Sequence, residues 1–178
     1  TRARSCCEGV VLVVNAEMIG ELELPQVDIV VAGGPTRSES VRSGLEVLPE
    51  SAEIVVIHDA ARPGAPIPMY LSVIDAVLGG ADAAVPGLPV TDTLKRVVDA
   101  PVGKKVKATV DRDTLMAIQT PQAFSKRMLE KAHAGGGQAT DDAGLVEAIG
   151  GTVMVVPGDA AAIKITHPSD ISIVAQLM

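Results

Sequence analysis

The fold is indicated most directly by residues 54–63, which read Ile54-Val55-Val56-Ile57-His58-Asp59-Ala60-Ala61-Arg62-Pro63. The four apolar residues predict a short buried strand, and a histidine, an aspartate and an arginine follow it closely. In an open parallel sheet, ligands bind outside the carboxyl ends of the strands. Asp59 and Arg62 are therefore predicted to face a ligand crevice, where a carboxylate beside a guanidinium suits an anionic substrate.

Composition limits the class of protein. The chain has 178 residues, 47% of them apolar, but only one tyrosine and one phenylalanine, so we expect a single α/β domain over residues 1–178 with an aliphatic core. The net charge of −7 and the lack of stacking rings disfavour a nucleic-acid or membrane-surface binder. The adjacent Cys6 and Cys7 fit neither an ordinary disulfide nor a tetrahedral metal site. We therefore expect a soluble, cytoplasmic protein with reduced thiols.

Short β-branched runs alternate with helical patterns along the chain, as is typical of α/β folds. The expected strands are residues 10–14, 28–31, 54–57, 83–86, 152–156 and 163–165. The expected helices begin near Arg37, where Thr36 and Glu39 have the spacing of a capping box, at Pro66, at Ser125, at residues 140–142 and near Pro168. The helix from Pro66 has Ile67, Leu71, Ile74 and Leu78 on one face, and Gly135-Gly136-Gly137 is expected to be a flexible break.

Residues 91–112 have a different character, because their alternation and mixed charge do not suit the buried middle of a sheet. We expect two polar strands joined by a turn at 99–103. Such a two-stranded arm buries little surface of its own and usually needs a partner. Most of its lysines are interpreted as a solvated strand edge.

Seven segments support a family resemblance. They are Gly33-Gly34-x-x-Arg37-x-x-Ser40-Val41, residues 58–63, Asp92-Thr93-Leu94-Lys95, Val110-Asp111-Arg112, Gln119-Thr120-Pro121-Gln122, Thr140-Asp141-Asp142 and Ile163-Lys164-Ile165-Thr166. In this order they resemble the 2-C-methyl-D-erythritol 4-phosphate cytidylyltransferases of the non-mevalonate isoprenoid pathway, and the resemblance covers nearly the whole chain. It implies a nucleotidyltransferase variant of the doubly wound, mostly parallel sheet, with a protruding β-arm.

The resemblance implies that methylerythritol phosphate attacks the α-phosphorus of CTP, giving 4-diphosphocytidyl-2-C-methyl-D-erythritol and pyrophosphate. A phosphate monoester is largely ionised at neutral pH, since its second pKa is about 6, so no general base is required. Catalysis is then expected from alignment, Mg²⁺ and cationic side chains. The resemblance also implies a homodimer, in which the arm carries Thr93 and Arg112 to the neighbouring site.

The nucleotide half of the site is assigned by the same resemblance. Gly33, Gly34 and Ser40 match the cytosine-binding turn, although Pro35 offers no backbone N–H there. The alternative is a strand-to-helix turn in which the glycines serve geometry alone. Asp59 is expected to contact CTP and to support Mg²⁺.

The acceptor half involves loops from across the chain. Arg112 and Lys164 match positions that hold the substrate phosphate for attack, and Thr93 accompanies them. The other expected substrate contacts come from Asp59, Arg62, Thr120 and Thr140. Asp59 and Arg62 could instead form a structural salt bridge, and Thr140 could serve as a helix N-cap. His58 is interpreted as structural, because a histidine at a strand end more often has that role.

One part of the family pattern is missing. The family normally opens with a strand, a glycine-rich loop carrying an arginine and a downstream Pro-Lys, which together hold the CTP phosphates. We therefore expect the sequence to be incomplete and the parent enzyme to be longer. Two alternatives stay open: a ribitol-5-phosphate (pentitol-phosphate) cytidylyltransferase, from which the motif ending in Lys95 differs, and a non-catalytic dimeric remnant.

Overall fold

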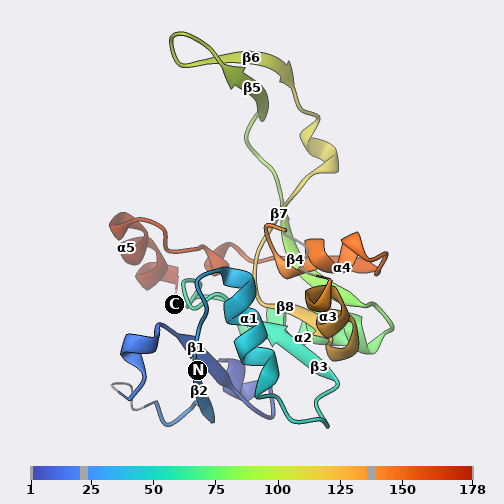
Figure 1. Ribbon diagram of the computed structural model, residues 1–178. Helices are drawn as coiled ribbons and strands as arrows, with labels where there is room; N and C mark the ends of the chain where they lie inside the picture. The colour runs from blue at the N-terminus through green and yellow to red at the C-terminus, as the bar shows by residue number, and fades with distance from the viewer. Residues whose placement is uncertain (1, 21–23, 136–138, 178) are drawn as a thin grey trace.

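The computed structural model describes residues 2–20, 24–135 and 139–177. A body of strands and helices carries a long two-stranded arm (Figure 1). The strands are β1 (Val11–Val14), β2 (Ile29–Ala32), β3 (Ile54–Ile57), β4 (Ala83–Pro89), β5 (Lys95–Asp99), β6 (Lys104–Thr109), β7 (Met116–Ile118), β8 (Gln122–Ser125) and β9 (Val153–Pro157). The helices are α1 (Arg37–Glu46), α2 (Ile67–Leu78), α3 (Lys126–Ala134), α4 (Asp142–Ala148) and α5 (Pro168–Leu177), with 3₁₀ turns at Ala3–Ser5, Ala16–Met18, Arg112–Thr114 and Ala160–Ala162.

The larger sheet of the body is built around β4. Strands β8 and β7 pair antiparallel with one edge of β4, β9 pairs parallel with its other edge, and β3 lies outside β8. Hence β3, β4 and β9 run in one direction and β7 and β8 in the other. The α/β class is confirmed. The sequence did not predict β7 and β8, because they are short and contain Gln, Ala, Met and Ser in place of β-branched runs.

Helices cover both faces of this sheet, and alternate residues of each strand contact opposite faces. Ala83 and Val85 of β4 and Phe124 of β8 pack with residues of α3 and α4. Ala84 and Ala123 instead pack with α2 through Val73 and Val77. Aliphatic side chains therefore form most of the core, as the composition predicted.

Helix α2 occupies the expected residues but turns a different face inward. Met69, Tyr70, Val73 and Val77 are buried. Ile67, Leu71 and Leu78, on the face that the sequence pattern singled out, are exposed. Apolar residues occur on both sides of this helix, so periodicity alone could not select the packed face.

The first two strands form a separate parallel pair, β1 with β2, and α1 lies against them. Helix α1 begins with the capping box expected from the sequence: the Thr36 hydroxyl accepts the Glu39 N–H, and the Glu39 carboxylate accepts the Thr36 N–H at 2.8 Å. Within the described residues, β1 pairs with no strand but β2, and β3 with no strand but β8.

The arm is confirmed as an antiparallel pair of exposed strands, β5 and β6, which extends away from the body (Figure 1). One expected strand is absent: residues 163–165 follow a 3₁₀ turn and form no strand. They lie beside the loop after β3, where the Ile165 N–H donates to the Ala61 carbonyl at 2.8 Å, and do not join a sheet edge. Gly135 caps α3, and the other two glycines of the expected break lie outside the described residues.

None of the helices in the described part of the chain is long and apolar enough to cross a membrane.

Candidate functional site

His58 ties the loop after β3 to a neighbouring segment. Its Nδ1 lies 3.0 Å from the Thr120 hydroxyl, and its Nε2 lies 3.2 Å from the Arg62 carbonyl. A carbonyl only accepts, so Nε2 carries the proton, and in the neutral ring Nδ1 accepts from Thr120. Burial lowers the pKa of His58 below its ordinary value, which favours this neutral form. These contacts agree with the structural role predicted for His58.

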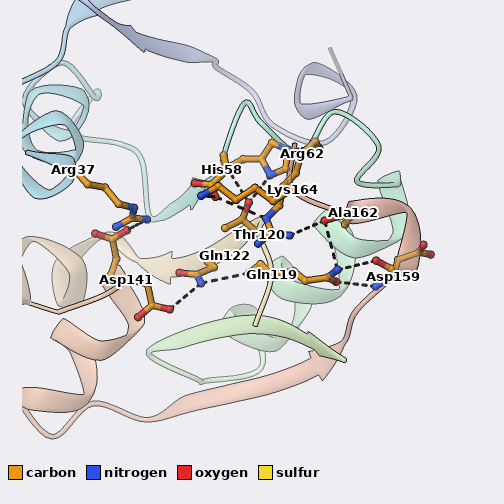
Figure 2. A network of polar contacts seen from close by, with 12 residues as sticks. Arg37, His58, Arg62, Gln119, Thr120, Gln122, Asp141, Asp159, Ala162 and Lys164 are labelled. Carbon is orange, nitrogen blue, oxygen red and sulfur yellow. Dashed lines mark hydrogen bonds and ion pairs between the residues drawn. The ribbon is translucent and has the colours of Figure 1, made fainter. Parts of the chain in front are cut away.

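A cavity of about 290 Å³ lies beside this loop. Its wall includes five residues that the sequence predicted for the site, and these come from separate segments: Asp59, Arg62, Thr120, Thr140 and Lys164. Figure 2 shows Arg62, Thr120 and Lys164 close together, with Arg37 and Asp141 on another side of the network. Residues far apart in the chain therefore converge on one place.

Asp59 pairs with Arg62 and Lys164, two of the three cationic side chains of the cavity wall. Its Oδ2 lies 3.0 Å from the Lys164 Nζ and 3.8 Å from the Arg62 Nε. The Arg62 side chain is 14% exposed and donates from Nη1 to the Ala162 carbonyl at 2.7 Å, whereas the Lys164 side chain is 47% exposed. The predicted salt bridge thus exists, and Lys164 is the more accessible of the two cations.

The Thr120 hydroxyl is engaged on both sides, because it also accepts the Asp59 N–H at 3.0 Å. With its proton donated to His58, it keeps one lone pair for a further contact. The Thr120–Pro121 peptide bond is cis.

Thr140 is not the cap of α4, so that alternative is wrong. Asp141 is the N-cap, and its Oδ1 accepts the Gly144 N–H at 3.0 Å. The other oxygen of Asp141 accepts from the Gln122 Nε2 at 3.1 Å. Because Asp141 takes the capping role, the exposed Thr140 is available at the cavity wall.

The predicted cytosine turn lies between β2 and α1, next to Arg37 of the cavity wall. A Cβ on Gly33 would lie 2.7 Å from the Ser40 Oγ, and one on Gly34 would lie 2.3 Å from the Glu39 Cβ. Both glycines are therefore needed for the close approach of the turn to the helix. They have this structural role whether or not a base also binds there. The Ser40 hydroxyl donates to the Thr36 carbonyl at 3.0 Å.

Five predicted site residues do not line this cavity: Gly33, Gly34 and Ser40 of the turn before α1, and Thr93 and Arg112. Thr93 and Arg112 are exposed at the base of the arm, and Arg112 donates to the Thr91 carbonyl. Their proposed contact with substrate therefore depends on a second copy of the chain.

Asp59 fits a Mg²⁺ ion only as one ligand among several. In the described ranges, no group of three or more His, Cys, Asp or Glu is arranged to hold a metal. Mg²⁺ commonly keeps several waters and binds one or two carboxylates together with substrate phosphates. A carboxylate at the edge of a cationic cavity is compatible with that pattern.

A family model described as 2-C-methyl-D-erythritol 4-phosphate cytidylyltransferase matches residues 2–178. The chain belongs to this family. A 2-C-methyl-D-erythritol 4-phosphate cytidylyltransferase from Streptomyces avermitilis is 47% identical over 147 residues, which cover 80% of this chain and 59% of the relative. One from Streptomyces coelicolor is 48% identical and is covered to 54%. The chain thus spans little more than half the length of these relatives.

Solved structures agree with the family assignment. The crystal structure of 2-C-methyl-D-erythritol 4-phosphate cytidylyltransferase from Thermus thermophilus has a TM-score of 0.85 at 36% identity, covering 98% of this chain and 84% of that one. This likeness also confirms the nucleotidyltransferase-type fold that the resemblance implied.

Five cavity residues of this cytidylyltransferase family member were not assigned to the site from sequence: Arg37, Ile118, Gln119, Gln122 and Asp141. The four polar ones each lie inside one of the seven family segments, and that membership was the available signal. Arg37 pairs through Nη2 with the Asp142 Oδ2 at 2.7 Å, and the Asp142 Oδ1 contacts the His133 Nε2 at 2.9 Å. Asp142 is fully buried, and no pattern in the sequence indicated this three-residue network.

The charge of Asp142 is maintained by its partners. Burial alone would raise the pKa of the Asp142 carboxyl, but hydrogen bonds and charge from His133 and Arg37 hold it below its ordinary value. The ionised carboxylate therefore joins the first turn of α1 to α3 and α4, and so fixes one wall of the cavity.

Proposed function

We propose that the protein transfers a cytidylyl group from CTP to 2-C-methyl-D-erythritol 4-phosphate, giving 4-diphosphocytidyl-2-C-methyl-D-erythritol and pyrophosphate in isoprenoid precursor biosynthesis. Family membership supports this activity. The observation that carries the proposal is the convergence of Asp59, Arg62, Thr140 and Lys164 on one cavity. We further propose a cytoplasmic location, in keeping with free thiols at Cys6 and Cys7.

The side chains of the cavity suit an anionic reaction. Two polyanions must approach each other, so the barrier is lowered by cations placed where charge accumulates. Lys164 is accessible and held by Asp59, so it supplies such a charge without a large rearrangement. The acceptor phosphate is its own nucleophile, because it is already ionised near neutral pH. His58 takes no proton in this scheme, since both of its ring nitrogens have protein partners.

The nucleotide would lie on the side of the cavity formed by α1. Gly33, Gly34 and Ser40 would take the cytosine, and Arg37, the first residue of α1, lies on the cavity wall. This order would bring the α-phosphate of CTP toward the acceptor phosphate that Lys164 holds. When bound, Mg²⁺ would neutralise phosphate charge, and Asp59 is the residue that would hold it.

The arm supports the proposal of a homodimer. Val97, Val98 and Val106 are exposed on β5 and β6, which is an unusual place for β-branched side chains unless another surface covers them. In such a dimer, the arm of one copy would bring Thr93 and Arg112 to the cavity of the other and complete the grip on the acceptor phosphate. Arginine suits this role because its planar fork makes paired hydrogen bonds to phosphate oxygens.

The experiment is a pyrophosphate-release assay with CTP and methylerythritol phosphate, run with and without Mg²⁺. We expect release only when both substrates and the metal are present. A parallel reaction with ribitol 5-phosphate as acceptor tests the pentitol-phosphate alternative. Dimerisation without release from either acceptor would instead favour the non-catalytic remnant.

A further inference from the structure

The position of Lys164 depends on a loop that follows β9. From Gly158 to Lys164 the chain is not in a strand and includes only one 3₁₀ turn, at Ala160–Ala162. The Asp159 side chain organises this turn by accepting the Ala161 N–H at 2.7 Å. Such local bonds shape the loop, but they do not fix it against the sheet.

Gln119 connects the loop to the end of β7. Its Nε2 donates to the Asp159 carbonyl at 2.9 Å, and its Oε1 accepts the Asp159 N–H at 3.0 Å (Figure 2). The same Nε2 lies 3.5 Å from the Ala162 carbonyl. One buried amide, 6% exposed, thus satisfies both backbone groups of Asp159, as a neighbouring strand would.

The loop has little room to move on either side of this contact. A Cβ on Gly158 would lie 2.5 Å from the Gln119 Oε1, and one on Gly64 would lie 2.1 Å from the Ala161 carbonyl oxygen. Arg62, on the same segment as Gly64, donates from Nη1 to the Ala162 carbonyl. The loop is therefore held between Gln119 and the segment after β3, two residues before Lys164.

We infer that Gln119 is a positioning residue, which sets the Lys164 amine against Asp59 and so against the acceptor phosphate. The inference rests on the proposed function, and it assigns no contact between Gln119 and substrate. The hydrogen bonds of Gln119 go to the loop that carries Lys164 and not to the turn at Gly33 and Gly34, so its loss should act on the acceptor and spare binding of the cytosine. A side chain that only filled the core would not discriminate between the two substrates.

The test is Gln119→Met, which keeps the length of the side chain and removes its hydrogen bonds, with Gln176→Met on the exposed face of α5 as the matched control. We expect KM for methylerythritol phosphate to rise about tenfold, the usual scale of one hydrogen bond to a charged group. KM for CTP should differ by less than about twofold from that of the unaltered protein, which is smaller than the effect of one lost hydrogen bond. Gln119→Asn, which keeps the amide but shortens its reach, replaces Gln119→Met if the latter unfolds.

Lys164→Met supplies the decisive comparison. If Gln119 acts through Lys164, Gln119→Met added to Lys164→Met raises the acceptor KM no further. The inference is overturned if Gln119→Met raises the acceptor KM by the same factor whether or not Lys164 is present. It is also overturned if Gln119→Met alone leaves the acceptor KM unchanged.

A readout without substrate separates this inference from the proposed function. Hydrogen exchange of the backbone amides at residues 158–165 should be faster in Gln119→Met, while the amides at residues 33–41 keep their rates. Unchanged exchange at 158–165 would refute the positioning role even in an active enzyme. Absence of pyrophosphate release from the unaltered protein would refute the proposed function alone.

Discussion

The variant Lys164→Met distinguishes the contribution of the lysine to catalysis from its contribution to stability. The ion pair with Asp59 spans 3.0 Å, but the Lys164 side chain is 47% exposed, so solvent screens the attraction. Exposed pairs of this kind contribute about 0–1 kcal/mol to stability. We therefore expect the free energy of unfolding to fall by less than about 1 kcal/mol, and methionine retains the apolar length of the side chain.

Activity should fall much further than stability. A hydrogen bond to a charged group contributes about 1.5–3 kcal/mol, which corresponds to about a 10- to 150-fold loss in kcat/KM. The assay is pyrophosphate release at varied methylerythritol phosphate, with urea unfolding of the same samples. Lys131→Met, in the last turn of α3 and away from the cavity, serves as the control. Unchanged kcat/KM, or a loss of stability as large as the loss of activity, would refute the assignment of Lys164.

Three further predictions concern charge and assembly. Asp142→Ala should lower the free energy of unfolding by about 1–3 kcal/mol in urea titrations, because it leaves the buried Nε2 of His133 without its hydrogen-bond partner; a change below about 0.5 kcal/mol would show that the network is not structural. Since the folded pKa of His58 lies below its ordinary value of 6.5, the unfolded chain binds more protons as pH falls through 6.5, and stability decreases toward pH 5. In thermal melts between pH 7 and 5, the stability of His58→Gln should depend less on pH than that of the unaltered protein. An unchanged pH dependence of stability would exclude His58 as its source. Arg112→Ala and Lys164→Ala should each lose activity and regain part of it when mixed, because a mixed dimer contains one intact site; no recovery in a demonstrated mixed dimer would contradict the shared site.

Local sequence rules predicted the elements whose signals lie within a few residues. The capping box at Thr36 and Glu39 fixed the start of α1, and the β-branched run at 54–57 gave β3 with its bounds. The arm was also predictable, because charge and alternation on both strands excluded a buried position. In these segments local chemistry and tertiary structure favour the same conformation.

Tertiary context decided the elements that sequence did not predict. Strand β8 begins at Gln122 and has little β propensity, yet it fills the sheet between β3 and β4 because Phe124 enters the core there. The buried face of α2 was ambiguous for the same reason, since either side offered apolar residues to a sheet.

The candidate site shows the same division. Five of the residues that the motifs singled out, Asp59, Arg62, Thr120, Thr140 and Lys164, line one cavity. The supporting bonds of Gln119 and Asp142 could not be predicted, because each joins segments that are distant in sequence or depends on which side chain caps a helix. The loops that carry the site could be recognised from sequence motifs, whereas the side chains that hold those loops in place could be identified only in the folded structure.

A structure of the protein with methylerythritol phosphate bound tests the central claim most directly. We expect the phosphate to lie within hydrogen-bond distance of the Lys164 Nζ, inside the cavity shared by Asp59, Arg62 and Thr140. A phosphate bound elsewhere, with Lys164 still paired only to Asp59, would contradict it.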